Sequence, residues 1–198
     1  MLPLVLASAS PRRADLLTAA GFRFDVCPVE IDERSAAGEL PADYVRRLAR
    51  EKARRAQELF RLPADRVVLG ADTTVVADGE IFGKPRDDDE AAAMLRRLSG
   101  RRHDVLTGIS VRRGEVELHQ TESTAVFMGT LGDQEVRWYV QSGEGRDKAG
   151  AYAIQGAASR FIWRIEGSYS NVVGLPVAAV YALIRQLSDK NADIASAR

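Results

Sequence analysis

The apolar and polar positions of the chain follow two periods along most of its length. Short apolar or alternating runs predict strands, and runs whose apolar residues recur every three or four positions predict helices. The predicted strands span residues 4–7, 22–29, 67–77, 103–112 and 115–128, with further β structure in 151–165. The predicted helices span residues 11–20, 41–60, 87–98, 133–141 and 175–187. This order predicts an α/β fold with a partly antiparallel sheet.

Local signals mark several of these boundaries. Ser10 and Pro11 suit the N-cap and the first position of a helix, and Gly21 suits its end. Asp78-Gly79 predicts a hairpin turn. Residues 188–198 are polar and carry no clean period, so we expect a single domain over 1–187 followed by a disordered tail.

Composition narrows the class of protein. Of the 198 residues, 28 are basic and 28 are acidic, so the formal charge is zero. Such a chain has no general attraction for nucleic acid, and an anionic partner must be held by a local site. A single Cys27 favours a reducing compartment, and no apolar run is long enough to cross a bilayer. We therefore expect a cytoplasmic enzyme that binds neither nucleic acid nor membrane.

Hydroxyl and guanidinium groups gather where the first strand meets the first helix. Ser8, Ser10, Arg12 and Arg13 lie at this turn. The free N–H groups and the positive end of a helix dipole favour an anion at such a place. Two interpretations fit the segment, a phosphate-binding loop or an ordinary helix start with two solvated arginines.

Lys52 interrupts the apolar stripe of the helix over residues 41–60. At 100° per residue it lies in the middle of the stripe that Leu48, Ala49, Ala53 and Ala56 define. An inward lysine extends its amine to solvent, pairs with a buried carboxylate or points into a ligand cavity. Lys52 is therefore a better candidate for a site than its charged neighbours.

A carboxylate interrupts the strand over residues 67–77. Asp72 follows an apolar run broken by Gly70, and burying its charge costs several kcal/mol unless the charge is paired or bound to metal. Glu33 supplies a second carboxylate and Lys84 a second ammonium. Two carboxylates suit a hard cation such as Mg²⁺, which bridges phosphate oxygens. The combination points to metal-assisted phosphoanhydride chemistry.

Histidine and cysteine are too scarce for other metal chemistry. His103 and His119 both fall in predicted strands, where we expect structural or surface roles. A zinc site of the usual kind is therefore not expected, and proton transfer would fall to carboxylates or lysines. Four acids at 87–90 begin a helix, and the helix dipole is sufficient to explain them.

Several motifs together resemble the Maf family of nucleoside triphosphate pyrophosphatases. They cover nearly the whole chain in order: Ser8-Ala-Ser-Pro-Arg-Arg13, Glu33, Glu51-Lys52-Ala53, Gly70-Ala-Asp72-Thr73, Gly83-Lys-Pro85, Leu98-Ser-Gly100, residues 147–156, Gly167-Ser-Tyr169 and residues 171–176. The resemblance implies an elongated mixed sheet flanked by helices, with two lobes around a central cleft, as in inosine triphosphatases. It also implies hydrolysis of a nucleoside triphosphate to monophosphate and pyrophosphate.

The same resemblance implies roles for single residues. Asp72 would be the base, with Glu33, Lys52 and Lys84 completing the catalytic set. The phosphate-binding residues would be Ser8, Ser10, Arg12 and Arg13. Mg²⁺ or Mn²⁺ would be held by Asp72 and Glu33, although the sequence leaves open which carboxylate binds metal and which activates water.

The resemblance also implies that substrate choice depends on three positions. Arg12, Thr73 and Gln155 resemble the branch of the family that hydrolyses dTTP and UTP. An amide both donates to and accepts from a pyrimidine edge, although Gln155 could equally satisfy backbone groups beside Gly156. Modified pyrimidine triphosphates fit the same pocket, and 7-methyl-GTP is the alternative substrate.

Two further expectations follow from the resemblance. The protein would form a homodimer. The alternative to an enzyme is a nucleotide-sensing regulator of cell division without catalysis, but a pure binder needs the cations and not a buried base. Joint retention of Asp72, Glu33, Lys52 and Lys84 favours the enzyme.

Overall fold

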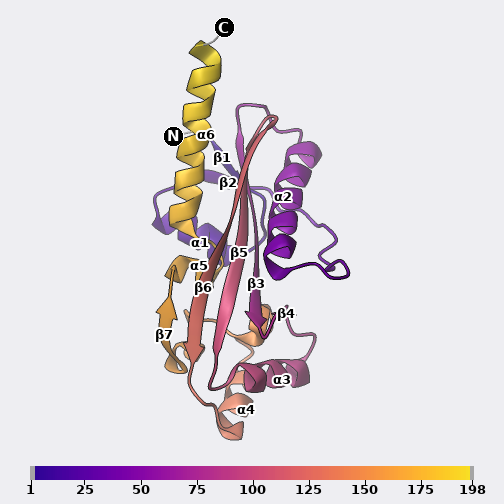
Figure 1. The fold of residues 1–198 in the computed structure, drawn as a ribbon, viewed down its shortest axis with the longest axis vertical. Helices are drawn as coiled ribbons and strands as arrows, with labels where there is room; N and C mark the ends of the chain where they lie inside the picture. Colours follow the sequence, from indigo (N-terminus) through magenta and orange to yellow (C-terminus); the bar gives the residue numbers. More distant parts are fainter. Residues whose placement is uncertain (1–2, 197–198) are drawn as a thin grey trace. The chain divides into compact units, whose positions relative to one another are not determined.

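Helices flank one mixed sheet in the computed structural model, which describes residues 3–196 (Figure 1). Within these residues the sheet has seven strands in the order β2-β1-β3-β5-β6-β7, and β4 pairs with β3. The strands are β1 Leu4–Leu6, β2 Phe24–Val26, β3 Val67–Ala77, β4 Glu80–Phe82, β5 Arg102–Arg113, β6 Val116–Met128 and β7 Ile162–Glu166. The helices are α1 Pro11–Ala19, α2 Pro41–Leu59, α3 Asp88–Leu98, α4 Asp133–Gln141, α5 Tyr169–Val173 and α6 Val177–Ser196, with short 3₁₀ turns at Ala149–Ala151 and Ala157–Arg160.

Parallel and antiparallel pairs are both present in the sheet. Strand β1 runs parallel to β2 and to β3, with Leu4 opposite Phe24 and Val67. Strand β4 is antiparallel to β3, and β7 is antiparallel to β6. The predicted mixed sheet with flanking helices is therefore confirmed.

The described chain divides into two compact units. Of the described residues, the first comprises 3–72, 107–122 and 174–196, and the second comprises Thr73–Leu106 and Ser123–Val173. Each unit has its own hydrophobic core. The extent of a single domain over 1–187 stays a prediction.

In the first unit the alternation along β3 separates two faces. Val67, Leu69 and Ala71 pack in the cluster that contains residues of α1 and α6. Val68 points the other way and packs with Ala53 and Ala56 of α2. Because side chains alternate across a strand, Gly70 and Asp72 lie on the same face as Val68, toward α2.

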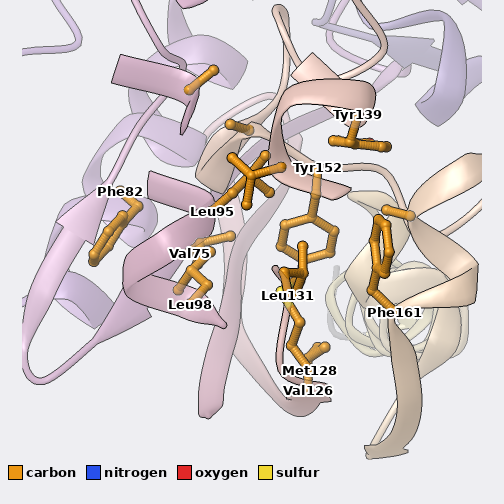
Figure 2. Close-up of a cluster of buried hydrophobic side chains, with 14 of the residues drawn as sticks. Val75, Phe82, Leu95, Leu98, Val126, Met128, Leu131, Tyr139, Tyr152 and Phe161 are labelled. Atoms are coloured by element: carbon orange, nitrogen blue, oxygen red, sulfur yellow. The ribbon is translucent and has the colours of Figure 1, made fainter. Parts of the chain in front are cut away.

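The second unit has an aromatic core (Figure 2). Tyr139 of α4, Tyr152 and Phe161 are buried with Leu95 of α3 and Met128 of β6. The Tyr139 and Phe161 rings meet edge to face, with centroids 6.1 Å apart. This packing fixes α4 against the segment that follows Gly150.

The β structure predicted for residues 151–165 is largely wrong. Only β7 is a strand, and the residues before it form turns. Gly150 and Ala151 both have positive φ, at +70° and +59°, which no strand allows. Side chains of the second unit bind the backbone N–H groups of this segment, so they replace the ladder of a sheet.

The ends of other elements also differ from prediction. β2 covers only three of the residues predicted over 22–29, and α5 was not predicted. Helix α6 begins at Val177 and continues beyond 187 to Ser196, because residues 188–196 contain no glycine or proline to end it. The last two residues of the predicted tail, 197–198, lie outside the described residues. Among residues 3–196, no helix has the length and hydropathy of a membrane span.

Candidate active site

A close approach between α2 and β3 brings Lys52 to the sheet. A Cβ at Gly70 would lie 2.1 Å from the carbonyl oxygen of Ala49 and 2.8 Å from the backbone nitrogen of Ala53. Only glycine therefore lets the helix backbone lie this close to the strand. Lys52 projects from the same helix face and is 8% exposed.

Lys52 forms an ion pair with the carboxylate two residues beyond Gly70. Its Nζ lies 2.7 Å from Oδ1 of Asp72, and both side chains are almost fully buried. A buried carboxylate and a buried ammonium each cost several kcal/mol alone, so their pairing is what allows either to be there. The predicted inward lysine and the predicted buried carboxylate are thus partners.

Burial changes the acidity of Asp72. It raises the pKa of the carboxyl group above its ordinary value, while the positive charges of Lys52 and Arg13 act in the opposite direction. A raised pKa makes the carboxylate a stronger base than an exposed aspartate. Asp72 therefore has the acid–base character that proton removal from water requires.

Glu33 is the second carboxylate on Lys52. Its Oε1 lies 2.6 Å from Nζ of Lys52, and its side chain is 52% exposed. Glu33 comes from the irregular segment between β2 and α2, where the Tyr44 hydroxyl of α2 donates to its backbone carbonyl at 2.9 Å. Two carboxylates thus surround one ammonium, one buried and one facing solvent.

The turn between β1 and α1 is held by Arg13. This buried guanidinium donates from Nη1 to the Ser8 hydroxyl and from Nε to the Gly174 carbonyl, both at 2.9 Å. The Ser8 hydroxyl also accepts from the backbone N–H of Ser10 at 3.3 Å. Burial lowers the pKa of Arg13, but an arginine remains charged in a protein.

The N-terminus of α1 carries no side-chain cap. Ser10 occupies the N-cap position, yet its side chain makes no capping hydrogen bond. Arg12 follows at the start of the helix and is half-buried. The end of α1 therefore presents backbone N–H groups, the place where an anion binds most readily.

Three of the predicted site residues belong to the second unit. Thr73 follows Asp72 directly on β3, whereas Lys84 and Gln155 are exposed in loops. The two loops are joined by a hydrogen bond from the Gly150 N–H to the Gly83 carbonyl at 3.1 Å. That Thr73, Lys84 and Gln155 act with Asp72 stays a prediction.

The other polar groups that the sequence singled out have structural roles. The Asp87 carboxylate caps α3 by accepting from the Glu90 N–H at 2.8 Å, and the other three acids lie in the first turn of the helix, so the acidic run begins a helix as predicted. His103 is buried, and its Nε2 lies 2.7 Å from the Tyr152 hydroxyl. His119 is exposed. In the described part of the chain, no three His, Cys, Asp or Glu residues form a group that could hold a metal ion.

The sequence pattern does not single out Tyr44 or Glu144, each of which contacts a loop that carries a predicted site residue. Tyr44 contacts the backbone of Glu33, and Glu144 contacts the segment that carries Gln155. The backbone groups that they bind are 11 and 13 residues away in the sequence. A hydroxyl at the edge of the α2 apolar stripe was the only signal for Tyr44.

Comparison with known proteins identifies relatives along almost the entire chain. The family model described as Maf-like protein matches residues 3–187. The dTTP/UTP pyrophosphatase of Anaeromyxobacter dehalogenans strain 2CP-C is 54% identical over 187 residues, which cover 92% of this chain and 93% of that protein. The dTTP/UTP pyrophosphatase of Koribacter versatilis strain Ellin345 is 49% identical over 183 residues, with the same coverage of each chain.

Solved structures give a more distant likeness. The Staphylococcus aureus Ham1 protein is 14% identical, with a TM-score of 0.45 over 64% of this chain and 71% of that chain. At this distance the likeness says nothing about the site. The family match, which extends over nearly all of the chain, decides the relationship. This chain belongs to the family of Maf-like proteins.

Proposed function

We propose that this protein hydrolyses dTTP and UTP to the nucleoside monophosphate and pyrophosphate. The observation that carries the proposal is the buried Lys52 ammonium, 2.7 Å from Asp72 Oδ1 and 2.6 Å from Glu33 Oε1. Relatives at 54% and 49% identity, both named dTTP/UTP pyrophosphatase, support the reaction and its substrates.

Asp72 is the proposed base. Its carboxylate takes a proton from a water molecule, and the resulting hydroxide attacks the α phosphorus. The new phosphorus–oxygen bond replaces the bond to the oxygen that bridges the α and β phosphates. That oxygen keeps the electron pair and leaves with pyrophosphate.

The phosphates need positive charge as the bond breaks. We assign their binding to the uncapped end of α1, with Ser8, Ser10, Arg12 and Arg13, and assign charge stabilisation to Lys52 and Lys84. Arg13 is buried and hydrogen-bonded to Ser8 and Gly174. Its proposed role is therefore to fix the turn between β1 and α1 and to place a positive charge beside it.

The carboxylates fit a divalent cation. Glu33 and Asp72 already meet around one positive charge, and Mg²⁺ is commonly held by one or two carboxylates together with waters and substrate phosphates. We therefore assign Mg²⁺ or Mn²⁺ to Asp72 and Glu33. A bound divalent ion would neutralise charge on the phosphates.

Selection of a pyrimidine is assigned to Arg12, Thr73 and Gln155. The alternative role for Gln155, satisfying the backbone of Gly156, is not needed. The Gly156 N–H donates to the Ala153 carbonyl, and its own carbonyl accepts from the Ser159 N–H. The Gln155 amide is therefore assigned to the base edge, where it can donate and accept at once. Modified pyrimidine triphosphates fit the same assignment.

Pyrophosphate release tests the reaction and its base together. The substrates are dTTP, UTP, CTP, GTP, ATP and 7-methyl-GTP, with Mg²⁺ or Mn²⁺, for the wild type and Asp72→Asn. We expect turnover of dTTP and UTP, reduced about 10²- to 10⁴-fold in the variant. Preferred turnover of 7-methyl-GTP would overturn the substrate assignment. Binding without turnover of any triphosphate would favour a nucleotide-sensing regulator.

Family membership also underlies two proposals about assembly and location. We propose that the protein forms a homodimer in the cytoplasm. Light scattering during size-exclusion chromatography tests the first, with twice the 21.7 kDa mass of the chain as the expected result. Fractionation of cells that produce the protein tests the second.

A further inference from the structure

Gln155 lies in a tight turn of the second unit. The backbone N–H of Gly156 donates to the carbonyl of Ala153 at 3.1 Å, which places Ile154 and Gln155 at the centre of a four-residue turn. Gln155 is exposed at this turn. The place from which its side chain extends is therefore set by how the turn itself is fixed.

Two side chains hold the turn from both ends. The Glu144 carboxylate accepts from the backbone N–H of Ala157 at 2.8 Å and, more weakly, from that of Ala158 at 3.4 Å. The Tyr139 hydroxyl accepts from the N–H of Ala153 at 3.0 Å. Tyr139 thus binds the first residue of the turn, and Glu144 binds the residue that directly follows it.

Glu144 and Tyr139 are also bonded to each other. The Tyr139 hydroxyl donates to Oε1 of Glu144 at 2.6 Å, so the two form one hydrogen-bonded unit. Tyr139 is 1% exposed and packs edge to face on Phe161, which fixes its ring in the core (Figure 2). The hydrogen-bonded pair of Tyr139 and Glu144 is therefore anchored in the hydrophobic core while it binds the backbone of the turn.

The carboxylate lies directly against the turn. A Cβ at position 156 would lie 2.1 Å from Oε2 of Glu144, so a larger residue there would displace the carboxylate. The glycine after Gln155 therefore lets the carboxylate lie against the turn.

Glu144 is ionised at neutral pH. Burial acts to raise its pKa, but the hydrogen bonds from Tyr139, Ala157 and Ala158 outweigh burial and leave the pKa below its ordinary value. Hydrogen bonds to an ionised acceptor are about twice as strong as neutral ones. The turn is therefore held by strong bonds that a neutral side chain cannot replace in full.

We propose that Glu144 and Tyr139 are positioning residues for pyrimidine selection, which hold the turn so that the Gln155 amide meets the edge of the base. The inference rests on the proposed function, because it assigns Gln155 to the base. Neither residue is assigned to the phosphates or to the attacking water. Their loss should therefore weaken binding and selection rather than the chemical step.

Two variants test the proposal, with a matched control. Glu144→Gln places an NH₂ donor where one carboxylate oxygen accepts, and Tyr139→Phe removes only the hydroxyl. Glu135→Gln is the control, because Glu135 lies on helix α4, as Tyr139 does, but accepts from the Gly132 N–H, outside the turn. The parameters kcat and KM are measured for dTTP, UTP and CTP, and the unfolding temperature is recorded for each protein.

We expect KM for dTTP and UTP to rise about tenfold in both variants, the effect of one lost strong hydrogen bond, with kcat within about twofold of wild type. The preference for UTP over CTP should fall by a similar factor, whereas the control keeps wild-type values. A general loss of stability would lower the active fraction, and so the apparent kcat, without changing this preference.

The outcomes separate this inference from the proposed function. If the wild type prefers dTTP and UTP but both variants keep its KM and its preference, the positioning role is wrong and the proposed function stands. A fall in kcat at unchanged KM would also overturn the positioning role. If the wild type hydrolyses triphosphates without preferring dTTP and UTP, both the substrate assignment and this inference fall.

Discussion

The backbone of Ala49 on α2 lies so close to Gly70 on β3 that a Cβ at position 70 would be 2.1 Å from the Ala49 carbonyl oxygen. Gly108 on β5 makes the same kind of approach, with a Cβ there 2.2 Å from the carbonyl oxygen of Val45. These two glycines let α2 rest directly on the sheet. Lys52 reaches Asp72 because of this contact, so the packing and the proposed chemistry have one origin.

Substitution of Gly70 by alanine should therefore destabilise the protein. The added methyl group meets backbone atoms of α2, which cannot move without shifting the helix, so we expect a loss of about 3 kcal/mol in the free energy of unfolding. Urea denaturation measures it. Gly83→Ala is the control, because no atom lies within 4 Å of a Cβ there and its stability should change little. Equal stability of Gly70→Ala and wild type would contradict the packing described.

Tyr44→Phe should affect the Glu33 carboxylate through the backbone of Glu33. Burial raises the pKa of Tyr44 to about 12, so its hydroxyl is protonated at neutral pH and donates to the Glu33 carbonyl. Loss of this bond frees the segment that carries Glu33, and we expect kcat/KM to fall about fivefold, as for the loss of about 1 kcal/mol. Tyr181→Phe on the exposed face of α6 is the control. Unchanged kcat/KM in Tyr44→Phe would show that the bond does not position Glu33.

His103 should make stability depend on pH. Burial, followed by the charge of Arg102, lowers the pKa of His103 to about 4, whereas in the unfolded chain it is about 6.5. Between these values the unfolded state binds the proton and the folded state does not, so stability falls as pH decreases. From pH 7 to pH 5 this amounts to about 2 kcal/mol.

Urea denaturation of wild type and His103→Gln at pH 7 and pH 5 measures this contribution. Carboxylates titrate over the same range in both proteins, so the comparison isolates the histidine. The loss of stability between the two pH values should be about 2 kcal/mol smaller in the variant. An equal loss in both proteins would mean that His103 is protonated in the folded state.

Removal of divalent metal should abolish turnover. In the described residues, no group of three His, Cys, Asp or Glu side chains could hold a cation, so a metal at Glu33 and Asp72 needs water and phosphate oxygens to complete its shell. Such a weakly held ion should be removed by EDTA and restored by excess Mg²⁺ or Mn²⁺, with pyrophosphate release as the readout. Full activity in EDTA would assign all charge stabilisation to the lysines and arginines.

The fold was predictable where the spacing of apolar residues within a single segment was regular. Helix α2 and strand β3 match their predicted spans almost residue for residue, because one apolar stripe and one apolar run define them. The segment before β7 was not predictable, because its backbone is held by Tyr139 and Glu144, which precede it by about a dozen residues. A window of sequence does not show such contacts.

The site was predictable where a residue contradicted its surroundings. Lys52 on an apolar stripe and Asp72 in an apolar strand were each anomalous, and the structure pairs them. Tyr44 and Glu144 contradict nothing around them, because a tyrosine and a glutamate on half-buried segments are ordinary. Each contacts backbone atoms of another segment, and only the folded chain shows those contacts.

In the proposed reaction, water attacks the α phosphorus of the triphosphate. Hydrolysis of dTTP in water enriched in ¹⁸O, followed by mass spectrometry of the products, tests it most directly. We expect one ¹⁸O atom in the monophosphate and none in the pyrophosphate. Label in the pyrophosphate would place the attack at the β phosphorus, and a diphosphate with labelled inorganic phosphate would place it at the γ phosphorus. Either result would contradict the account.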